Sequence, residues 1–321
     1  MVPSFVLSVP KCPARVSRTR YERSVTMSVI GFVGLGNMGG PMAANLVKAG
    51  YDVQGFDLGE EAKAAAARAG VTVVSSAEEA AEGADTLVTM LPKGDHVRSV
   101  LLGEDGPLTR LKPGGLVIDA SSIDVATSRD VHAKATELGL KVLDAPVSGG
   151  VAGATGGTLT FMIGGSAEAF AAAGPVLDAM GSKFFHVGDA GAGQAVKACN
   201  QMVVGASLVA VAEAFVLAEQ LGVSNQNLFD VLSTSSGNCW ALHNFTPRPG
   251  LVDGSAADNG YAPKFAAGLL AKDLGLAAAA ADDTGVQLVV GRGALQQVGK
   301  FAETDGGLDS SAVIRAVEIR S

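Results

Sequence analysis

The chain has 321 residues, of which 48% are hydrophobic and 17% are charged, and its net charge is −8. This length suggests about two domains, and the hydrophobic content excludes a disordered chain. An acidic chain with no basic run in its body is not expected to bind nucleic acid or a membrane surface. The three cysteines and four histidines are too scattered for a disulfide framework or a metal site, so neither is expected.

The N-terminal segment 1–26 differs in charge from the rest, because it has one acid, Glu22, and five basic residues: Lys11, Arg15, Arg18, Arg20 and Arg23. A mitochondrial-type transit peptide has this Arg-rich, acid-poor composition. We favour a non-native upstream start, with Met27 as the real first residue, because the first predicted strand begins directly after it. We therefore expect a cytoplasmic protein, or a mitochondrial matrix protein if the segment is a genuine transit peptide.

Strand-like and helix-like segments alternate up to about Val187. The expected strands are short apolar runs at residues 28–33, 52–56, 71–74, 86–90, 116–119, 141–143, 159–163 and 184–187. Alanine-rich helical segments lie between the early ones, for example at residues 41–49 and 59–69. This alternation predicts a mostly parallel sheet with helices on both faces.

The pattern changes after Val187. A glycine-rich turn at 188–193 leads into a long apolar helix at about 194–221, and helical patterns continue at 225–233, at 266–284 and near the C-terminus. A Pro- and Gly-rich loop at 245–260 interrupts them. We therefore expect an α/β domain at 27–188 and an all-helical domain at 189–321, with residues 1–26 outside the fold.

The long helix contains a nearly continuous apolar stretch at residues 202–218. A helix that spans a membrane needs ~20 predominantly apolar residues. This stretch is shorter and contains Glu213. We therefore interpret it as a buried core helix, apolar on all sides, and expect no membrane partner.

A glycine-rich motif follows the first predicted strand and precedes a helix: Gly34, Leu35, Gly36, Asn37, Met38 and Gly39. It matches G-x-G-x-x-G, in which the first glycine permits a tight turn. The second lets the backbone approach a pyrophosphate, and the third allows close helix–strand packing. The motif in this context predicts a Rossmann-type domain that binds a dinucleotide.

The second predicted strand ends at Asp57, at about the spacing where an acid binds the ribose 2′-hydroxyl of NAD. A 2′-phosphate beside this carboxylate would be repelled, and the residues that follow include no arginine to receive one. The sequence therefore favours NAD over NADP.

Further motifs extend over nearly the whole chain from Met27 onward, at residues 30–42, 90–92, 119–124, 144–150, 191–201 and 271–274. Together they resemble the β-hydroxyacid dehydrogenase family, which implies an NAD-dependent oxidoreductase acting on a small β-hydroxy acid. Segments 235–240 and 259–265 and the Pro-rich loop resemble the branch that oxidises 3-hydroxyisobutyrate to methylmalonate semialdehyde in valine breakdown. The Asn200–Gln201 pair also occurs in tartronate semialdehyde reductase-like members, which keeps that alternative open.

The resemblance implies roles for individual residues. In addition to the glycine motif and Asp57, the expected cofactor contacts are Leu91, Pro92, His96, Ser122 and Lys272. The expected substrate contacts are Ser148, Gly149, Gly150 and Lys272. By residue type alone, Trp240 and Phe245 are candidate walls for the substrate methyl group, although aromatic residues in a loop more often serve only in packing. Lys197 is the expected general acid/base. The family usually has Asn four residues after this lysine, whereas this chain has Gln201 there and Asn200 one position earlier, so either one is expected to assist Lys197.

The residue types and their places in the sequence also favour functional roles for Ser148 and Lys197, but each has a structural alternative. Ser148 follows a strand at the expected C-terminal edge of the sheet, where open α/β sheets bind ligands. A lysine such as Lys197 on a mostly apolar helix is uncommon unless it is paired or functional. The alternatives are a polar turn at Ser148, a lysine that extends its amine to solvent at Lys197, and a surface charge on an amphipathic helix at Lys272, which Asp273 follows.

Two other functions are less well supported by the sequence. A non-catalytic NAD-binding protein would not need Lys197, Ser148 and Lys272 together, and a sugar-phosphate dehydrogenase would need a basic cluster near Ser148. The very apolar second domain also predicts a buried subunit interface, and we expect a homodimer or homotetramer.

Overall fold

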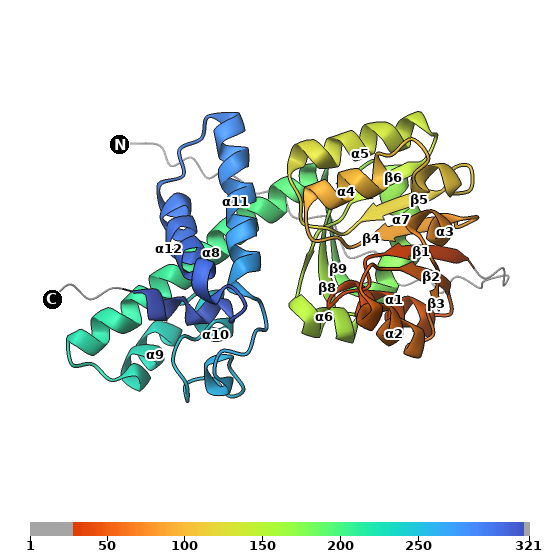
Figure 1. Ribbon diagram of the computed structural model, residues 1–321. Coiled ribbons are helices and arrows are strands. Elements are labelled where there is room, and N and C mark those ends of the chain that lie inside the picture. The colour runs from red at the N-terminus through yellow and green to blue at the C-terminus, as the bar shows by residue number, and fades with distance from the viewer. Residues whose placement is uncertain (1–27, 318–321) are drawn as a thin grey trace, which may run out of the picture.

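The computed structural model describes residues 28–317, which form a sheet-containing half and a helical half (Figure 1). The described sheet has nine strands: β1 (Val29–Val33), β2 (Asp52–Phe56), β3 (Thr72–Val73), β4 (Thr86–Thr89), β5 (Leu116–Asp119), β6 (Lys141–Asp144), β7 (Val147–Ser148), β8 (Leu159–Gly165) and β9 (Gly181–Gly188). Strands β1 to β6 are parallel in the order β3-β2-β1-β4-β5-β6, which is the doubly wound order of dinucleotide-binding domains.

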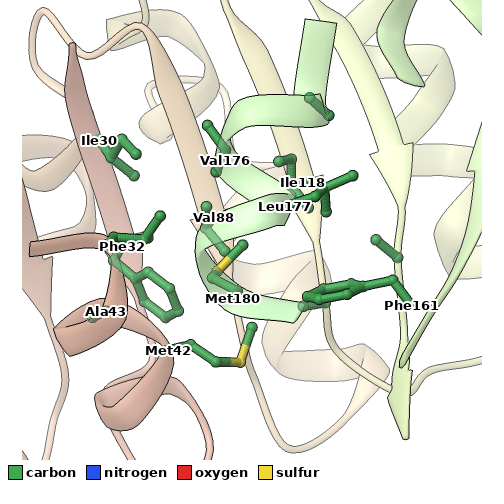
Figure 2. Packing of buried hydrophobic residues seen from close by; sticks show 14 of the residues in the cluster. Ile30, Phe32, Met42, Ala43, Val88, Ile118, Phe161, Val176, Leu177 and Met180 are labelled. Carbon is green, nitrogen blue, oxygen red and sulfur yellow. The ribbon is translucent and has the colours of Figure 1, made fainter. Parts of the chain in front are cut away.

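The helices of this half are α1 (Gly39–Lys48), α2 (Glu60–Arg68), α3 (Ala77–Ala81), α4 (Gly94–Leu101), α5 (Val125–Glu137), α6 (Gly150–Gly156) and α7 (Ala167–Met180), with one 3-10 turn, η1 (Pro107–Arg110). Side chains alternate between the two faces along each strand, and both faces are buried. Ile30 and Phe32 pack on one face against Met42 of α1 and Met180 of α7 (Figure 2). Val33 belongs to the separate cluster on the other face.

The helical half begins with α8 (Ala192–Gln220), which extends out of the sheet half (Figure 1). It continues with α9 (Asn225–Thr234), α10 (Trp240–Asn244), η2 (Ala257–Asn259), α11 (Ala267–Thr284), α12 (Val289–Asp305) and η3 (Ser310–Ala316). Leu208 and Phe215 of α8 pack with Leu270 of α11 and Val298 of α12 in one core. Half of the most apolar window of α8 is buried. Its apolar character therefore suits the core of the helical half, although its length and composition alone would also allow a membrane span.

The predicted fold class is confirmed, and two details of the sheet differ from the prediction. Strand β8 pairs antiparallel with β6 and with β7. Strand β7 was not predicted, because two residues carry no periodic signal. The predictions for residues 1–26 and for a start at Met27 lie outside the described residues.

Candidate active site

The glycine motif between β1 and α1 has the geometry that its three glycines predict. Gly34 has a φ of +97°, and a Cβ added there would overlap the carbonyl oxygen of Met90. A Cβ on Gly39 would overlap the carbonyl oxygen of Gly34, whereas a Cβ on Gly36 would meet nothing within 4 Å. The first and third glycines therefore allow the tight turn and the close packing. The second leaves open space beside the start of α1, where a pyrophosphate fits.

Asp57, directly after β2, lies against this motif. Its Oδ2 accepts a hydrogen bond from the Leu35 amide at 2.7 Å, and its Oδ1 accepts one from the Gly59 amide at 2.7 Å. An ionised carboxylate has about four acceptor sites, so it retains capacity for ribose hydroxyl groups. The residues present therefore fit an NAD molecule whose adenosine ribose lies at the end of β2.

The ends of β4 and β5 are joined by hydrogen bonds beside the glycine motif. The Leu91 amide donates to Ser121 Oγ at 2.8 Å, and Thr89 Oγ1 donates to Asp119 Oδ1 at 2.7 Å. Asp119 is almost fully buried, and its Oδ2 has no hydrogen-bond partner. Burial, and to a smaller extent the neighbouring Asp144, raises the pKa of Asp119 to about 6 despite the hydrogen bonds that favour its charged form.

Lys272 of α11 connects the helical half to both strand ends. Its Nζ donates to the Ser122 carbonyl at 2.9 Å and to the Pro92 carbonyl at 3.3 Å, and lies 3.1 Å from Asp273 Oδ1. The structure therefore brings three of the expected cofactor residues together. His96 is exposed near the start of α4.

Lys197 lies in the second turn of α8 and is only 8% exposed. Its Nζ donates to the Val147 carbonyl at 2.8 Å, next to Ser148. Burial lowers the pKa of Lys197; Asp273 opposes this shift and Lys272 adds to it. A larger fraction of this lysine is therefore the free amine near neutral pH than the about one in a thousand expected for an ordinary lysine.

A small cavity lies beside Lys197, between α8, α11 and the loop after β5. It is lined by Ile123, Gln194, Lys197, Ala198, Gln201, Asp273 and Leu276. Gln201 Nε2 donates to Asp273 Oδ2 at 2.7 Å, and Asn200 Nδ2 donates to Gln201 Oε1 at 3.0 Å. Gln201 therefore lines the cavity itself, whereas Asn200 contacts the lining through Gln201.

The remaining predicted substrate residues occupy two places. Ser148 lies in β7, and Gly149 and Gly150 both have positive φ at the start of α6, next to the carbonyl that Lys197 contacts. Trp240 is 59% exposed and Phe245 is buried in the helical core, with ring centroids 5.4 Å apart. Neither aromatic residue lines the cavity.

Five of the residues that line the cavity were not among the predicted site residues, and two of these five are polar: Asp273 and Gln194. Asp273 belongs to the motif at residues 271–274, but the sequence assigns it no role of its own, and its burial to 5% exposure is a tertiary property. A polar residue in the apolar α8 sequence was the available signal for Gln194.

Comparison with known proteins identifies the family. Residues 29–188 match a family described as the NAD binding domain of 6-phosphogluconate dehydrogenase, and residues 191–317 match one described as NAD-binding of NADP-dependent 3-hydroxyisobutyrate dehydrogenase. A 3-hydroxyisobutyrate dehydrogenase of Pseudomonas aeruginosa is 46% identical over 290 residues, which are 89% of this chain and 97% of the relative. The chain belongs to the 3-hydroxyisobutyrate dehydrogenase family.

Two further members of the family are informative. The solved structure of a Mycobacterium tuberculosis 3-hydroxyisobutyrate dehydrogenase with L-serine has a TM-score of 0.87 and 49% identity, and covers 92% of this chain and 100% of that chain. An NAD-dependent L-serine dehydrogenase of Pseudomonas aeruginosa is 46% identical over 255 residues, or 79% of this chain and 86% of the relative. The resemblance seen in the sequence, the oxidoreductase class and NAD binding are thereby confirmed.

Proposed function

We propose that this family member oxidises 3-hydroxyisobutyrate to methylmalonate semialdehyde with NAD, and that Lys197 is its general acid/base. The supporting observation is the place of the buried Lys197 amine. It contacts the Val147 carbonyl next to Ser148, and it shares a cavity with Ile123 of the loop that follows Ser122. A base at this point can reach a hydroxyl group held between the substrate loop and the cofactor residues.

Each residue then has a defined task. The Ser148 hydroxyl and the backbone amides of Gly149 and Gly150 bind the substrate carboxylate and fix the position of its hydroxymethyl group. Lys197 in its free-amine form accepts the hydroxyl proton, so that the C–O bond becomes a carbonyl as the carbon loses a hydride. NAD, when bound, supplies the acceptor for that hydride. Asp273 then stabilises the ammonium form of Lys197 by its negative charge.

This assignment gives the two directions of reaction opposite pH dependences. Oxidation needs the free amine, so its rate rises with pH until Lys197 is deprotonated. The midpoint lies below the ordinary lysine value of 10.5, because burial lowers this pKa. Reduction of the semialdehyde needs the ammonium form and slows over the same pH range.

A second candidate substrate is L-serine, which carries an ammonium group where 3-hydroxyisobutyrate has a methyl group. The cavity contains both apolar side chains, such as Ile123 and Leu276, and the buried carboxylate of Asp273. The apolar side suits the methyl group, and the carboxylate suits the ammonium group. Glycerate, the reduced partner of tartronate semialdehyde, is the third candidate.

The experiment is an initial-rate panel of 3-hydroxyisobutyrate, L-serine, glycerate and 1-propanol with NAD. We expect 3-hydroxyisobutyrate to have the highest kcat/KM. We also expect 1-propanol to be at least ~10³-fold worse, because it lacks the carboxylate and leaves the groups that bind it unpaired. A higher kcat/KM for L-serine or glycerate would replace the proposed substrate. Equal turnover of 1-propanol would contradict carboxylate binding by the Ser148 loop.

We also propose that the protein is a homodimer or homotetramer. The support is a set of exposed apolar side chains in the helical half: Val203, Leu217, Leu221, Val231, Val289 and Val290. Light scattering after size exclusion measures the mass, and a monomer would contradict the proposal. The cytoplasmic location stays a prediction, since relatives include bacterial proteins and the human mitochondrial enzyme.

A further inference from the structure

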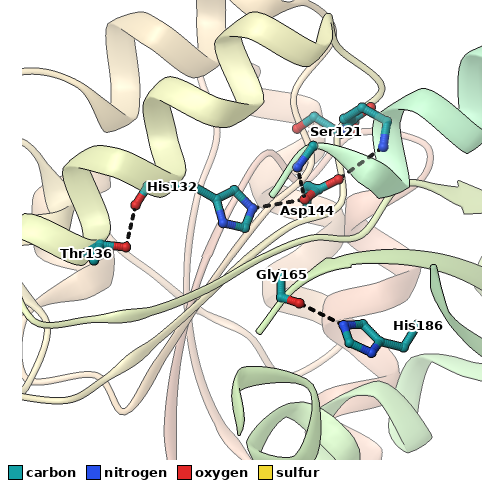
Figure 3. Close-up of polar contacts among 8 residues, drawn as sticks. Ser121, His132, Thr136, Asp144, Gly165 and His186 are labelled. Atoms are coloured by element: carbon teal, nitrogen blue, oxygen red, sulfur yellow. Dashed lines mark hydrogen bonds and ion pairs between the residues drawn. The ribbon is translucent and has the colours of Figure 1, made fainter. Parts of the chain in front are cut away.

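A buried carboxylate outside the reaction site holds the start of the helix that carries Lys197. Asp144, the last residue of β6, is 1% exposed. It accepts hydrogen bonds from the Gly191 amide at 2.9 Å and from the Gln194 amide at 3.0 Å, and His132 Nε2 lies 2.9 Å away (Figure 3). The two amides belong to the N-terminal end of α8, so this carboxylate caps that helix from the sheet.

The contact between Asp144 and α8 allows little displacement. A Cβ on Gly193 of α8 would lie 2.8 Å from Asp144 Oδ2, and a Cβ on Gly164 of β8 would lie 2.5 Å from Asp144 Oδ1. Both glycines are therefore needed for the close approach. The negative charge also interacts favourably with the N-terminal end of the helix dipole of α8, which is 29 residues long.

The side chain of Gln194 fixes the same helical turn to the loop that follows β5. Its Nε2 donates to the Ser121 carbonyl at 2.7 Å, and its Oε1 accepts from the Ile123 amide at 3.1 Å. These two backbone groups flank Ser122, one of the expected cofactor contacts. The first turn of α8 is therefore hydrogen-bonded to two places. One is the end of β6, which leads into the substrate loop at 147–150, and the other is the cofactor loop at 121–123.

Lys197 lies one turn further along α8. Its position therefore depends on the position of the first turn of α8, which Asp144 and Gln194 hold. Its Nζ meets the Val147 carbonyl, three residues after Asp144, so both ends of the short segment 144–147 contact α8. A change in the position or tilt of the first turn would move the amine relative to both loops.

We propose that Asp144, His132 and Gln194 are positioning residues that hold Lys197 at a fixed place between the cofactor loop and the substrate loop. We call these three residues the α8 anchor. The proposal rests on the proposed role of Lys197 as the general acid/base. Asp144 and His132 touch neither the cavity nor the reacting atoms and act through the helix, while Gln194 acts through its bonds to the cofactor loop.

The test is a double-mutant cycle between Asp144→Asn and Lys197→Ala. Asp144→Asn retains the shape but removes the charge and turns an NH₂ group toward a donor. We expect kcat to fall about 10- to 100-fold, because a displacement of ~1 Å at a reacting group can cost that much. In the Lys197→Ala background we expect the same change to lower kcat less than about threefold, because no amine remains to be displaced.

The cycle separates positioning from a loss of folded protein. Fewer folded molecules would lower kcat by the same factor in both backgrounds, and that additive outcome would overturn the proposal. Asp85→Asn is the control: this acid accepts from the Val29 amide at the amino ends of β1 and β4, far along the strands from their carboxyl ends, and we expect unchanged kcat in both backgrounds.

If Asp144→Asn does not fold, His132→Phe tests the positioning role in its place. His132→Phe retains a ring and both helix hydrogen bonds but removes one donor from Asp144. We expect a severalfold loss of kcat that disappears in the Lys197→Ala background, and an equal loss in both would count against the anchor. If Lys197→Ala itself retains full kcat, the proposed role of Lys197 fails. If Lys197→Ala loses ~10²–10⁴-fold in kcat and the anchor variants are additive with it, only the positioning proposal fails.

Discussion

The sheet half and the helical half contribute to the site in different ways. In the sheet half, the predicted cofactor residues other than His96 lie at strand ends or in the turns and first helical residues directly after them. The bond between Leu35 and Asp57 joins residues 22 apart in the sequence. In the helical half, Gln201 meets Asp273 across 72 residues, and Lys272 meets Ser122 across 150. The expected cofactor contacts of the sheet half are therefore organised largely by local structure, whereas Lys272 and the proposed reaction site depend on how helices pack.

The largest expected effect is a loss of kcat without a loss of NAD binding, which distinguishes the reaction site from the cofactor site of the sheet half. Lys197→Ala should lower kcat by ~10²–10⁴, the usual contribution of a general acid/base, and leave the Kd for NAD unchanged. Steady-state kinetics and NAD titration measure these quantities, and Lys183→Ala on β9 is a matched control with an exposed lysine. A loss of kcat below about tenfold would make Lys197 a packing residue and Lys272 the next candidate.

A second comparison tests whether the glycine motif acts as two separable parts. Gly39→Ala should lower the free energy of unfolding by about 3 kcal/mol, because its Cβ would overlap the Gly34 carbonyl. Gly36→Ala should leave stability unchanged, because its Cβ meets nothing within 4 Å. It should nevertheless weaken NAD binding, since the added methyl group obstructs the approach of the pyrophosphate. Parent-like NAD affinity in Gly36→Ala would place the pyrophosphate elsewhere.

The third prediction concerns stability and pH in the sheet half. Burial raises the pKa of Asp119 from 3.8 to about 6, so the folded state binds more protons than the unfolded state between these values. The contribution of Asp119 to the free energy of unfolding therefore falls as pH rises through this range, by ~3 kcal/mol in total. Asp119→Asn lacks this fall, so its stability relative to the parent should increase between pH 4 and pH 7.

Urea unfolding of both proteins across this range measures the difference. Asp85→Asn is the control of opposite sign: burial raises the pKa of Asp85, but Lys112 and the Val29 amide outweigh that effect and lower it below its ordinary value. Below pH 4, its stability relative to the parent should decrease as pH rises, and between pH 4 and pH 7 it should stay nearly constant, because the folded and unfolded pKa values of Asp85 both lie below this range. A pH-independent difference for Asp119→Asn would show that Asp119 is not protonated near pH 5.

The smallest expected effect concerns cofactor choice. Asp57→Asn removes the charge that would repel a 2′-phosphate and retains an oxygen that accepts from a loop amide. The ratio of kcat/KM for NAD to that for NADP should fall about tenfold, which corresponds to ~1.4 kcal/mol. Asp52→Asn, at the opposite end of β2, should leave the ratio unchanged. Equal use of both cofactors by the parent would contradict the preference for NAD.

Much of the fold followed from the sequence, because strand and helix periodicities are local. The alternating apolar runs predicted β1 to β6 with small errors at their ends, and the change of pattern after Val187 predicted the helical half. The antiparallel pairing of β8 was not predictable, since a strand of either direction has the same alternation. Strand β7 has only two residues and exists because β8 lies beside it.

The sequence by itself determined the positions whose role depends on backbone geometry, such as Gly34, Gly39 and Asp57. A required turn or strand end leaves a local signature that does not depend on the rest of the molecule. The tertiary structure alone decided that Gln201 rather than Asn200 lines the cavity, that Asp273 is buried beside Lys197, and that Asp144 caps α8. These facts depend on which helix faces meet and on how far water is excluded, and both are properties of the packed chain rather than of any short segment of it.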